Sequence, residues 1–574
     1  MAARYWVGGS GTWDASDTTH WSATTGGAGG ASAPTAADTV NFDASSGTAA
    51  VVTVTATAVS LSTTINKSDI NLSLSGNVTL CTAAGTLTLT AGTITLNNNV
   101  LTCGFFTAAS ATAKTLAFGT GSLNVSGNNG FVYDSYNAAS EITITGTPTV
   151  NCTYAGSTGT RRVQPGLTQA SSINLNITAG TDIFRFASGF PFLNVNFTGF
   201  SGTWSNFAFT LYGNLTISSG MTVTAGTAVL TCAATSGIQL ITTNGKTLDF
   251  PITQNGVGGT VQLQDNLTMG STRTFTLTNG DLHINNQTLS TGLFSSSNSN
   301  VRTIDFKSGN ITVTGNNTTV WTTSTITNFS YAGTPTVNFT YAGAVGTRQI
   351  TTGNGTEAQV LNYNITAGTD GIGFISAVRS LNFTGFSGPY NQATTQLVAY
   401  RNVTFSAGMT ITGGTGTLYF YSVSSTQNLT TNGKTINCPI IVGDTTQAPT
   451  LVCQDALTQG STRNFTVTNG TIQLKNGVTS TVGAFATSGT KPKFLLSTTP
   501  GSQATLSQAS GTVNASYLTI QDITAIGGAT FNAYTDQSNV DAGNVDGWDF
   551  GISPIIGGAE YTYALRSFTQ HGRF

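Results

Sequence analysis

The stretch Gly146-Thr-Pro-Thr-Val-Asn-Cys-Thr-Tyr-Ala-Gly156 returns almost unchanged as Gly333-Thr-Pro-Thr-Val-Asn-Phe-Thr-Tyr-Ala-Gly343. The two copies belong to a chain of 574 residues, of which only 7% are charged. Self-similarity at a fixed period is the sequence signature of a repeat architecture. The stretch therefore predicts a protein built from long repeated units.

The same long period, about 188 residues, appears at further places along the chain, as a repeat architecture requires. Four pairs support it: 176–182 with 364–370, 197–202 with 383–388, 242–247 with 430–435, and 270–273 with 460–463. Their shifts are not identical, as expected when insertions fall in corner loops. We predict a first repeat at 49–266 (its repeated part begins near residue 80), a second at 267–455 and a partial third at 456–512.

Within each repeat the sequence consists of short runs in which apolar residues alternate with Thr or Ser. Examples are Gly76–Cys81, Gly85–Gly92 and Val100–Cys103, each followed by Gly, Asn or Ala-Gly. Alternation with period two is typical of strands, and Asn and Gly tolerate the left-handed conformations of tight corners. Hairpins are an alternative, but two-residue Asn-Gly turns are few. We predict an all-β fold, a right-handed parallel β-helix or β-solenoid with about eight coils per repeat and a cap at each end.

Composition limits the classes of function. The formal net charge is −2, which gives no electrostatic attraction to nucleic acid or anionic lipid. No run approaches the ~18 apolar residues of a membrane helix, and the first residues lack an apolar core, so we expect no secretory signal and no membrane insertion.

The six cysteines show no zinc-like spacing: Cys81, Cys103, Cys152, Cys232, Cys438 and Cys453. Across the repeats Cys152 is replaced by Phe339, and Cys453 replaces Leu263. A cysteine that exchanges with Phe or Leu is expected to be a buried free thiol that packs as a small hydrophobe. Reduced thiols fit a protein that folds in a reducing cytoplasm.

Residues 1–48 differ from the rest and hold three of the six tryptophans, Trp6, Trp13 and Trp21. Tryptophan is suited to closing the open end of a β-stack or to docking on a partner, and we select these three as candidate docking residues. Asp14, Asp38 and Asp43 are expected to make turns and loop hydrogen bonds.

The pattern W-x-G-G-x-G-x-W-D, then H-W-S, then P-x-x-A-D and a Phe resembles the opening of many β-helical surface and virion proteins. His20 stands where Asn is common in that pattern. The resemblance implies an entry cap rather than a chemistry.

Residues 513–550 are predicted to form a final coil and a cap closed by Trp548. Asp541, Gly543 and Val545 occupy alternating positions of a calcium loop, but no bidentate Glu follows. The Gly527-Gly-Ala-Thr-Phe531 run and the later Gly547-Trp-Asp-Phe550 are similar to the ending of β-helical proteins of phages and of bacterial surface proteins.

Residues 551–574 form an aromatic, mildly basic tail. A terminal segment usually frays, whereas one rich in Tyr, Phe and Arg is suited to a partner's groove. We prefer docking over a disordered end, and the candidate docking residues are Tyr561, Tyr563, Leu565, Arg566, Phe568, Arg573 and Phe574.

Aromatic residues along the repeats are expected to stack in the core. The candidates are Phe197, Phe200, Phe383 and Phe386, together with Tyr154 and Tyr341.

The chain contains few residues of the types that usually catalyse reactions. It contains three Glu and three His, and no P-loop, G-x-S-x-G or H-E-x-x-H motif. Matched charges, such as Arg161 with Arg348 and Asp182 with Asp370, suggest a structural role at a recurring corner. The unmatched Asp281 and Asp305 could still meet on adjacent coils, as a polysaccharide-degrading site would need. We expect no enzymatic activity, no cofactor and no metal.

These features resemble bacteriophage β-helical fibre and spike proteins. The resemblance implies a non-enzymatic structural or adhesive protein of a virion, a fibre, spike or capsid-attached appendage, made in the host cytoplasm. It implies other virion proteins as partners, a host cell-surface glycan or receptor as a further one, and a homotrimer by analogy. The alternatives are a bacterial surface adhesin and a tailspike-type polysaccharide depolymerase.

Overall fold

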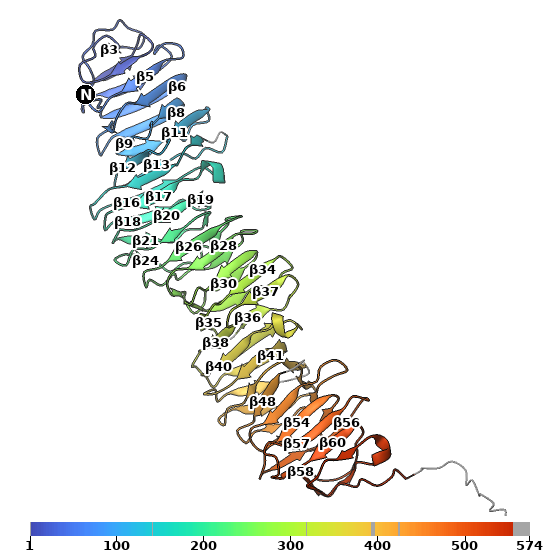
Figure 1. The fold of residues 1–574 in the computed structure, drawn as a ribbon. Helices are drawn as coiled ribbons and strands as arrows, with labels where there is room; N and C mark the ends of the chain where they lie inside the picture. Colours follow the sequence, from blue (N-terminus) through green and yellow to red (C-terminus); the bar gives the residue numbers. More distant parts are fainter. Residues whose placement is uncertain (1, 140–141, 317, 392–395, 423–424, 555–574) are drawn as a thin grey trace, which may run out of the picture. The chain divides into compact units, whose positions relative to one another are not determined.

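The computed structural model describes residues 2–139, 142–316, 318–391, 396–422 and 425–554. These residues form a β-solenoid of about 23 turns, whose strands are drawn as arrows in Figure 1. Helical structure in the described part is limited to three single turns: η1 (Gln169–Ser171), η2 (Glu357–Gln359) and η3 (Thr535–Gln537). The predicted all-β solenoid built from internal repeats is confirmed.

The chain divides into two compact units. The N-terminal unit comprises residues 1–391 and 408–410, and the C-terminal unit comprises residues 392–407 and 411–574. This division does not test the predicted repeat boundaries. The first predicted boundary, at residue 266, lies between β28 and β31, and these two strands pair with each other. The boundary therefore marks a change of sequence repeat and not a break in the stack of coils.

The first strands of the N-terminal unit belong to a 15-stranded sheet among the described residues. Its strands are β1 (Ala3–Trp6), β2 (Gly11–Trp13), β3 (Trp21–Ser22), β4 (Thr39–Phe42), β5 (Val51–Val54), β6 (Ser62–Leu74), β8 (Thr86–Thr95), β10 (Phe105–Thr107), β11 (Lys114–Ala117), β13 (Gly130–Asp134), β14 (Thr143–Thr145), β16 (Thr160–Gln164), β18 (Ile183–Phe186), β21 (Thr203–Ser205) and β24 (Thr222–Val223).

A second, 12-stranded sheet follows another side of the same coils. Its strands are β7 (Val78–Thr79), β9 (Val100–Cys103), β12 (Ser122–Val125), β15 (Thr149–Cys152), β17 (Asn174–Ile177), β20 (Asn194–Asn196), β23 (Leu215–Thr216), β26 (Ile238–Thr242), β28 (Thr260–Leu263), β31 (Gly280–His283), β34 (Arg302–Asp305) and β37 (Phe329–Ala332).

Two further runs of paired strands complete the N-terminal unit. One consists of β19 (Phe190–Phe192), β22 (Phe209–Leu211), β25 (Leu230–Cys232), β27 (Ile252–Gln254), β30 (Thr274–Leu277), β33 (Leu293–Ser295), β36 (Thr319–Thr323), β39 (Thr347–Thr352), β41 (Gly371–Val378) and β43 (Pro389–Asn391). The other consists of β29 (Leu267–Thr268), β32 (Thr288–Thr291), β35 (Asn310–Val313), β38 (Thr336–Phe339), β40 (Asn362–Ile365) and β42 (Ser380–Asn382).

The C-terminal unit is built from the same kind of short strand. Its strands are β44 (Leu397–Ala399), β45 (Val403–Thr404), β47 (Leu418–Phe420), β48 (Thr426–Thr430), β49 (Thr435–Ile436), β50 (Ile440–Val442), β51 (Thr450–Cys453), β52 (Thr458–Gln459), β53 (Asn464–Val467), β54 (Gly470–Leu474), β55 (Thr479–Val482), β56 (Ala484–Thr487), β57 (Lys493–Ser497), β58 (Ala504–Gln508), β59 (Thr512–Asn514), β60 (Leu518–Gln521), β61 (Ile523–Gly527), β62 (Thr530–Asn532), β63 (Val540–Asp541) and β64 (Val545–Asp546). One more strand, β46 (Thr410–Thr412), begins in the N-terminal unit and ends in the C-terminal one.

Alternation in the sequence decides which side chains enter the core. In β12, Leu123 and Val125 are fully buried while Ser122 and Asn124 lie on the outer side. The described pairings are parallel, apart from β1 with β3, so like positions of successive coils stack on one another. Burial of the resulting column of Leu, Val, Ile and Phe is the main stabilising contribution.

Outward-facing asparagines extend the hydrogen bonding between coils. Asn151 donates from Nδ2 to Oδ1 of Asn124 (2.8 Å), and Asn176 donates in the same way to Asn151 (2.9 Å). The second repeat keeps part of this ladder, since Asn364 donates to Asn338 at 2.9 Å. Each amide donates to one neighbour and accepts from the next, which fixes the register of the stack.

The repeat does not contain a whole number of turns. Along the 12-stranded sheet, eight steps lead from β9 to β31. The sequence equivalent of β9 in the following repeat is β32, which is the next strand after β31 and belongs to a different sheet. Because most turns carry three strands, a repeat spans eight turns and about one third of another. Equivalent strands such as β9 and β32, or β12 and β35, therefore lie in different sheets.

Candidate functional site

The first coil is closed by a cluster of aromatic side chains. Trp6, Trp13 and Trp21 have no exposed surface, and they pack around Phe42 with ring centroids 5.8, 5.9 and 6.3 Å from it. His20 stacks on Trp6 at 4.7 Å. The three tryptophans thus seal the end of the stack, and none of them is at the surface where a partner could contact it in this conformation.

The three acidic residues of the same segment hold its loops, as predicted. Asp14 accepts hydrogen bonds from the backbone of Ser16 and Asp17, and Asp43 accepts from Ser45. Asp38 accepts from the Thr35 hydroxyl and amide, and from Ala2. The hydrogen bonds from Thr35 lower the pKa of Asp38, so this carboxylate stays ionised as an acceptor.

The last described coil is also closed by an aromatic residue. Trp548 packs on Phe531 at 5.1 Å and on Phe485 at 6.2 Å. The Asp541 carboxylate accepts the Gly543 N–H at 2.8 Å and forms a turn. The docking residues predicted in the tail, Tyr561 to Phe574, lie outside the described residues.

The charges matched between repeats form buried ion pairs. Arg161 donates from Nε and Nη2 to the two carboxylate oxygens of Asp182 at 2.8 and 2.7 Å, and Arg348 does the same to Asp370 at 2.8 Å for both bonds. All four side chains are 0% exposed. Gly180 takes φ +105° beside Arg161, where a Cβ would lie 2.6 Å from Nη2. The predicted structural role of these charges is confirmed.

The aromatic predictions are right for the phenylalanines and wrong for the tyrosines. Phe197, Phe200 and Phe383 are fully buried, and so is Phe386. Tyr154 is only half-buried: its ring covers the Arg161 guanidinium at 5.6 Å, and Tyr341 covers Arg348 at 5.7 Å. A phenol at this corner shields the ion pair from water and keeps its hydroxyl at the surface.

The structure shows a recurring buried cation that the comparison of the repeats in sequence did not find. Lys114, Arg302 and Lys493 occupy equivalent places in the successive repeats, each at the first position of a strand. Lys114 donates to the carbonyls of Ser110 and Thr112, and Lys493 donates to those of Gly489, Lys491 and Ser516. Arg302 donates to four backbone carbonyls in the same way. The exchange of Lys for Arg hid the match.

All six cysteines are buried free thiols, as predicted. Burial raises the pKa of Cys152, Cys232 and Cys453 to about 12. The thiols therefore stay neutral near pH 7 and act as packing groups.

The two unmatched carboxylates lie on adjacent strands but not opposite each other. Asp281 of β31 is aligned with Thr303 of β34, and Asp305 is aligned with His283. Asp305 pairs with Lys307 at 2.9 Å. Burial alone would raise the pKa of Asp305, but the hydrogen bonds and charge of Lys307 outweigh it, so the pKa lies below its usual value.

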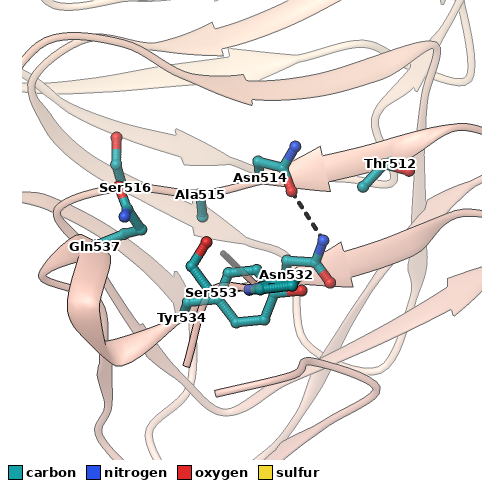
Figure 2. Close-up of a pocket in the computed structure, with 9 residues that line it drawn as sticks. Thr512, Asn514, Ala515, Ser516, Asn532, Tyr534, Gln537 and Ser553 are labelled. Atoms are coloured by element: carbon teal, nitrogen blue, oxygen red, sulfur yellow. Dashed lines mark hydrogen bonds between the residues drawn. The ribbon is translucent and has the colours of Figure 1, made fainter. Parts of the chain in front are cut away.

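A pocket of about 510 Å³, lined by uncharged residues, lies near the end of the C-terminal unit (Figure 2). Asn532 donates from Nδ2 to Oδ1 of Asn514 at 2.8 Å across two strands. Tyr534 and Gln537 also line the pocket, and none of its lining residues is charged. Neutral amides and hydroxyls of this kind can hydrogen-bond a neutral polar molecule.

A second hollow, of about 240 Å³, lies on the N-terminal unit and is lined by Phe131, Arg162, Arg185, Phe207 and the 186–188 segment. Phe131 is aligned with Arg162, and Arg162 with Arg185, on three successive strands. The Arg162 guanidinium lies over the Phe131 ring at 5.8 Å, and that of Arg185 lies over Phe207 at 5.9 Å. We call this hollow the arginine groove.

The described residues do not gather three or more His, Cys, Asp or Glu side chains into a group that could hold a metal ion. Within the same part of the chain, no helix has the length and hydrophobicity needed to cross a membrane. Comparison with protein-family models, with curated proteins and with solved structures found no match to this chain.

Proposed function

We propose that this chain is a non-enzymatic structural and adhesive protein of a bacteriophage virion: a fibre, spike or capsid-attached appendage. The observation that carries the proposal is the construction of the coils. Matched charges are locked inside as bidentate pairs, and outward amides are hydrogen-bonded from coil to coil. Such a scaffold holds surface groups at fixed spacing, which is what a structural or adhesive protein requires.

Two other features support the same proposal. The aromatic clusters around Phe42 and Trp548 close the first and last described coils and cover core that would otherwise be exposed. The buried, reduced cysteines fit folding in a host cytoplasm before assembly. The proposal places the protein in a virion because its opening and closing motifs are similar to those of virion proteins. A trimer is part of it by analogy with phage fibres.

The proposal that the protein is not an enzyme rests on the positions of two carboxylates and on the pKa of one of them. A glycosidase needs two carboxyl groups on either side of the scissile bond, one of them with a raised pKa. Asp281 and Asp305 are out of register along adjacent strands, and Lys307 keeps the pKa of Asp305 low. This arrangement disfavours a general acid at that position.

Mass spectrometry of purified virions tests the location. We expect the chain among the structural proteins, in a fixed ratio to the major capsid protein. Its absence from virions, together with surface labelling of bacteria by an antibody to the chain, would transfer the adhesive role to a bacterial surface protein. Release of reducing sugar from host capsule by the purified chain, abolished by Asp281→Asn or Asp305→Asn, would establish the depolymerase instead.

A further inference from the structure

The arginine groove places two like charges side by side. Arg162 on β16 and Arg185 on β18 occupy the same register on neighbouring parallel strands, which lie about 4.8 Å apart. Like charges directly opposite each other on a sheet destabilise it. The N-terminal unit tolerates this repulsion at one position of its outer surface.

Neither guanidinium is neutralised within the described part of the chain. Among the described residues, no carboxylate lies within 4.0 Å of Arg162 or Arg185, and neither side chain donates a hydrogen bond to another described residue. The Arg185 Nε is buried without a partner. The nearest acid along these strands, Asp134 of β13, is aligned with Gln164 and not with Arg162. A buried N–H without an acceptor is costly, so the groove is short of an anion.

The second repeat shows that the fold does not need these residues. Thr319, Gln349 and Gly373 are aligned there as Phe131, Arg162 and Arg185 are in the first repeat. The neighbouring ion pair is kept in both repeats, as Arg161 with Asp182 and Arg348 with Asp370. The buried ion pair is therefore part of the scaffold, whereas Arg162 and Arg185 occur in the first repeat and are replaced by Gln349 and Gly373 in the second.

Besides the two charged arginines, the arginine groove contains two aromatic rings that form an apolar surface. Phe131 is 39% exposed, which is unusual for a ring in this chain, and Phe207 is half-buried on the other side of the groove. Each ring lies under one guanidinium and holds it in place. The hollow thus offers two fixed forks of N–H donors and two aromatic rings in about 240 Å³.

We propose that the arginine groove binds an acidic saccharide. A planar carboxylate accepts two parallel hydrogen bonds from a guanidinium, and the oxygens of a tetrahedral anion such as sulfate can accept them as well. The apolar C–H face of the sugar ring packs on Phe131 or Phe207, and the volume suits one sugar residue. This inference rests on the adhesive part of the proposed function and names its ligand class.

Nucleic acid fits the same groove less well. Non-specific binding to nucleic acid needs several cations along a stripe, because affinity grows with the number of phosphates neutralised. The groove has two cations, on a chain of net charge −2. Two arginines between two rings match a single anionic sugar.

Glycan binding by the full chain and by point variants tests the proposal. The probes are a hyaluronan oligosaccharide (carboxylates only), a chondroitin sulfate oligosaccharide, neutral dextran and single-stranded DNA, measured by calorimetry at two salt concentrations. Arg162→Gln and Phe131→Thr introduce the residues of the second repeat, and Arg185→Gln removes the second charge. Lys475→Gln removes an exposed charge from the C-terminal unit and serves as the matched control.

We expect one or both acidic oligosaccharides to bind, more weakly at higher salt, and dextran not to bind. Binding of hyaluronan shows that a carboxylate is sufficient, and binding of chondroitin sulfate without hyaluronan identifies the sulfate as the anion. Loss of a charged hydrogen bond should weaken binding about tenfold or more in Arg162→Gln and Arg185→Gln. Lys475→Gln should bind as the wild type does. Unchanged thermal unfolding midpoints show that the variants fold.

Three outcomes overturn the proposal: no binding of either acidic oligosaccharide, equal loss of binding in Lys475→Gln, or tighter binding of the DNA. These results are separate from the test of location. A chain that is present in virions but binds no acidic saccharide refutes only the groove, and a chain that binds but is absent from virions refutes only the virion assignment.

Discussion

Arg161 and Asp182 form a bidentate ion pair inside the solenoid, 2.7 and 2.8 Å between the bonded atoms, with both side chains 0% exposed. The Arg161 guanidinium is enclosed by the rings of Tyr154, Phe184 and Phe200 at 5.5–5.6 Å. A charge buried this deeply is tolerated only with its partner in place.

Removing one member of the pair should therefore be severe. We expect Asp182→Ala to lower the free energy of unfolding of the N-terminal unit by about 3–5 kcal/mol, because it leaves an uncompensated buried charge. The double variant Arg161→Met with Asp182→Leu should recover most of that loss. Denaturant unfolding followed by tryptophan fluorescence measures both. A loss below about 1 kcal/mol for Asp182→Ala would contradict a dry, enclosed pair.

The recurring cation gives a second stability test with its own control. Lys493→Ala leaves the carbonyls of Gly489, Lys491 and Ser516 without their donor, and we expect a cost of about 1–3 kcal/mol. Lys493→Arg should be close to neutral, since Arg302 fills the equivalent position of the second repeat. Chemical unfolding of the two variants side by side checks this. Equal destabilisation by Ala and Arg would mean that length, and not charge, matters here.

Alkaline pH should destabilise the protein through its thiols. Burial raises the pKa of Cys232 from 9.0 to about 12. The unfolded chain therefore releases this proton at a lower pH than the folded chain. The contribution is fully present below pH 9 and is lost as the pH rises from 9 toward 12. We expect the unfolding free energy to fall over that range, and to fall less steeply in Cys232→Val.

The same burial predicts slow thiol chemistry. At pH 8 a thiol-specific reagent should modify the native protein only on the timescale of unfolding, and should titrate six thiols once the chain is denatured. Rapid modification of any cysteine in the native protein would show a local opening at that coil.

The tryptophan cluster should stabilise the first coil against local unfolding. Trp21→Ala removes a fully buried ring that contacts Trp6, Trp13 and Phe42, and we expect a cost of about 3–5 kcal/mol confined to the first coils. Hydrogen exchange should accelerate in residues 2–60 and stay unchanged in the C-terminal unit. Val51→Thr, at a position 46% exposed, is the control and should leave exchange as in the wild type.

Much of the fold was predictable because its signals are local. In runs such as Val100–Cys103 alternation predicts the inward side chains, and Leu101 and Cys103 are buried; the exchange of Cys152 for Phe339 likewise indicates an inward position. The match of Arg161 with Arg348 predicts a structural role for both, and both form buried ion pairs. Tyr154 was misplaced, because an aromatic ring in a repeat can pack in the core or over a buried charge, and sequence alone does not separate the two.

The candidate site was less accessible to sequence reasoning. Arg162 and Arg185 stand on successive coils, far apart in the chain, and only the length of the turn brings them side by side. The absence of Arg162 from the second repeat, where Gln349 stands, was the one signal that could have distinguished it from Arg161. The sequence also predicts Trp6, Trp13 and Trp21 as docking residues, but all three are buried inside the cap.

The sequence by itself determined the strands, their inward faces and the long internal repeat, because period-two alternation and self-similarity are properties of the residues in order. The tertiary structure decided which residues meet. Because a repeat spans eight turns and about one third of another, the equivalent strands β9 and β32 do not share a sheet. That fraction depends on how many residues each coil needs to close around its core, which is set by packing between coils and not by any single stretch of sequence.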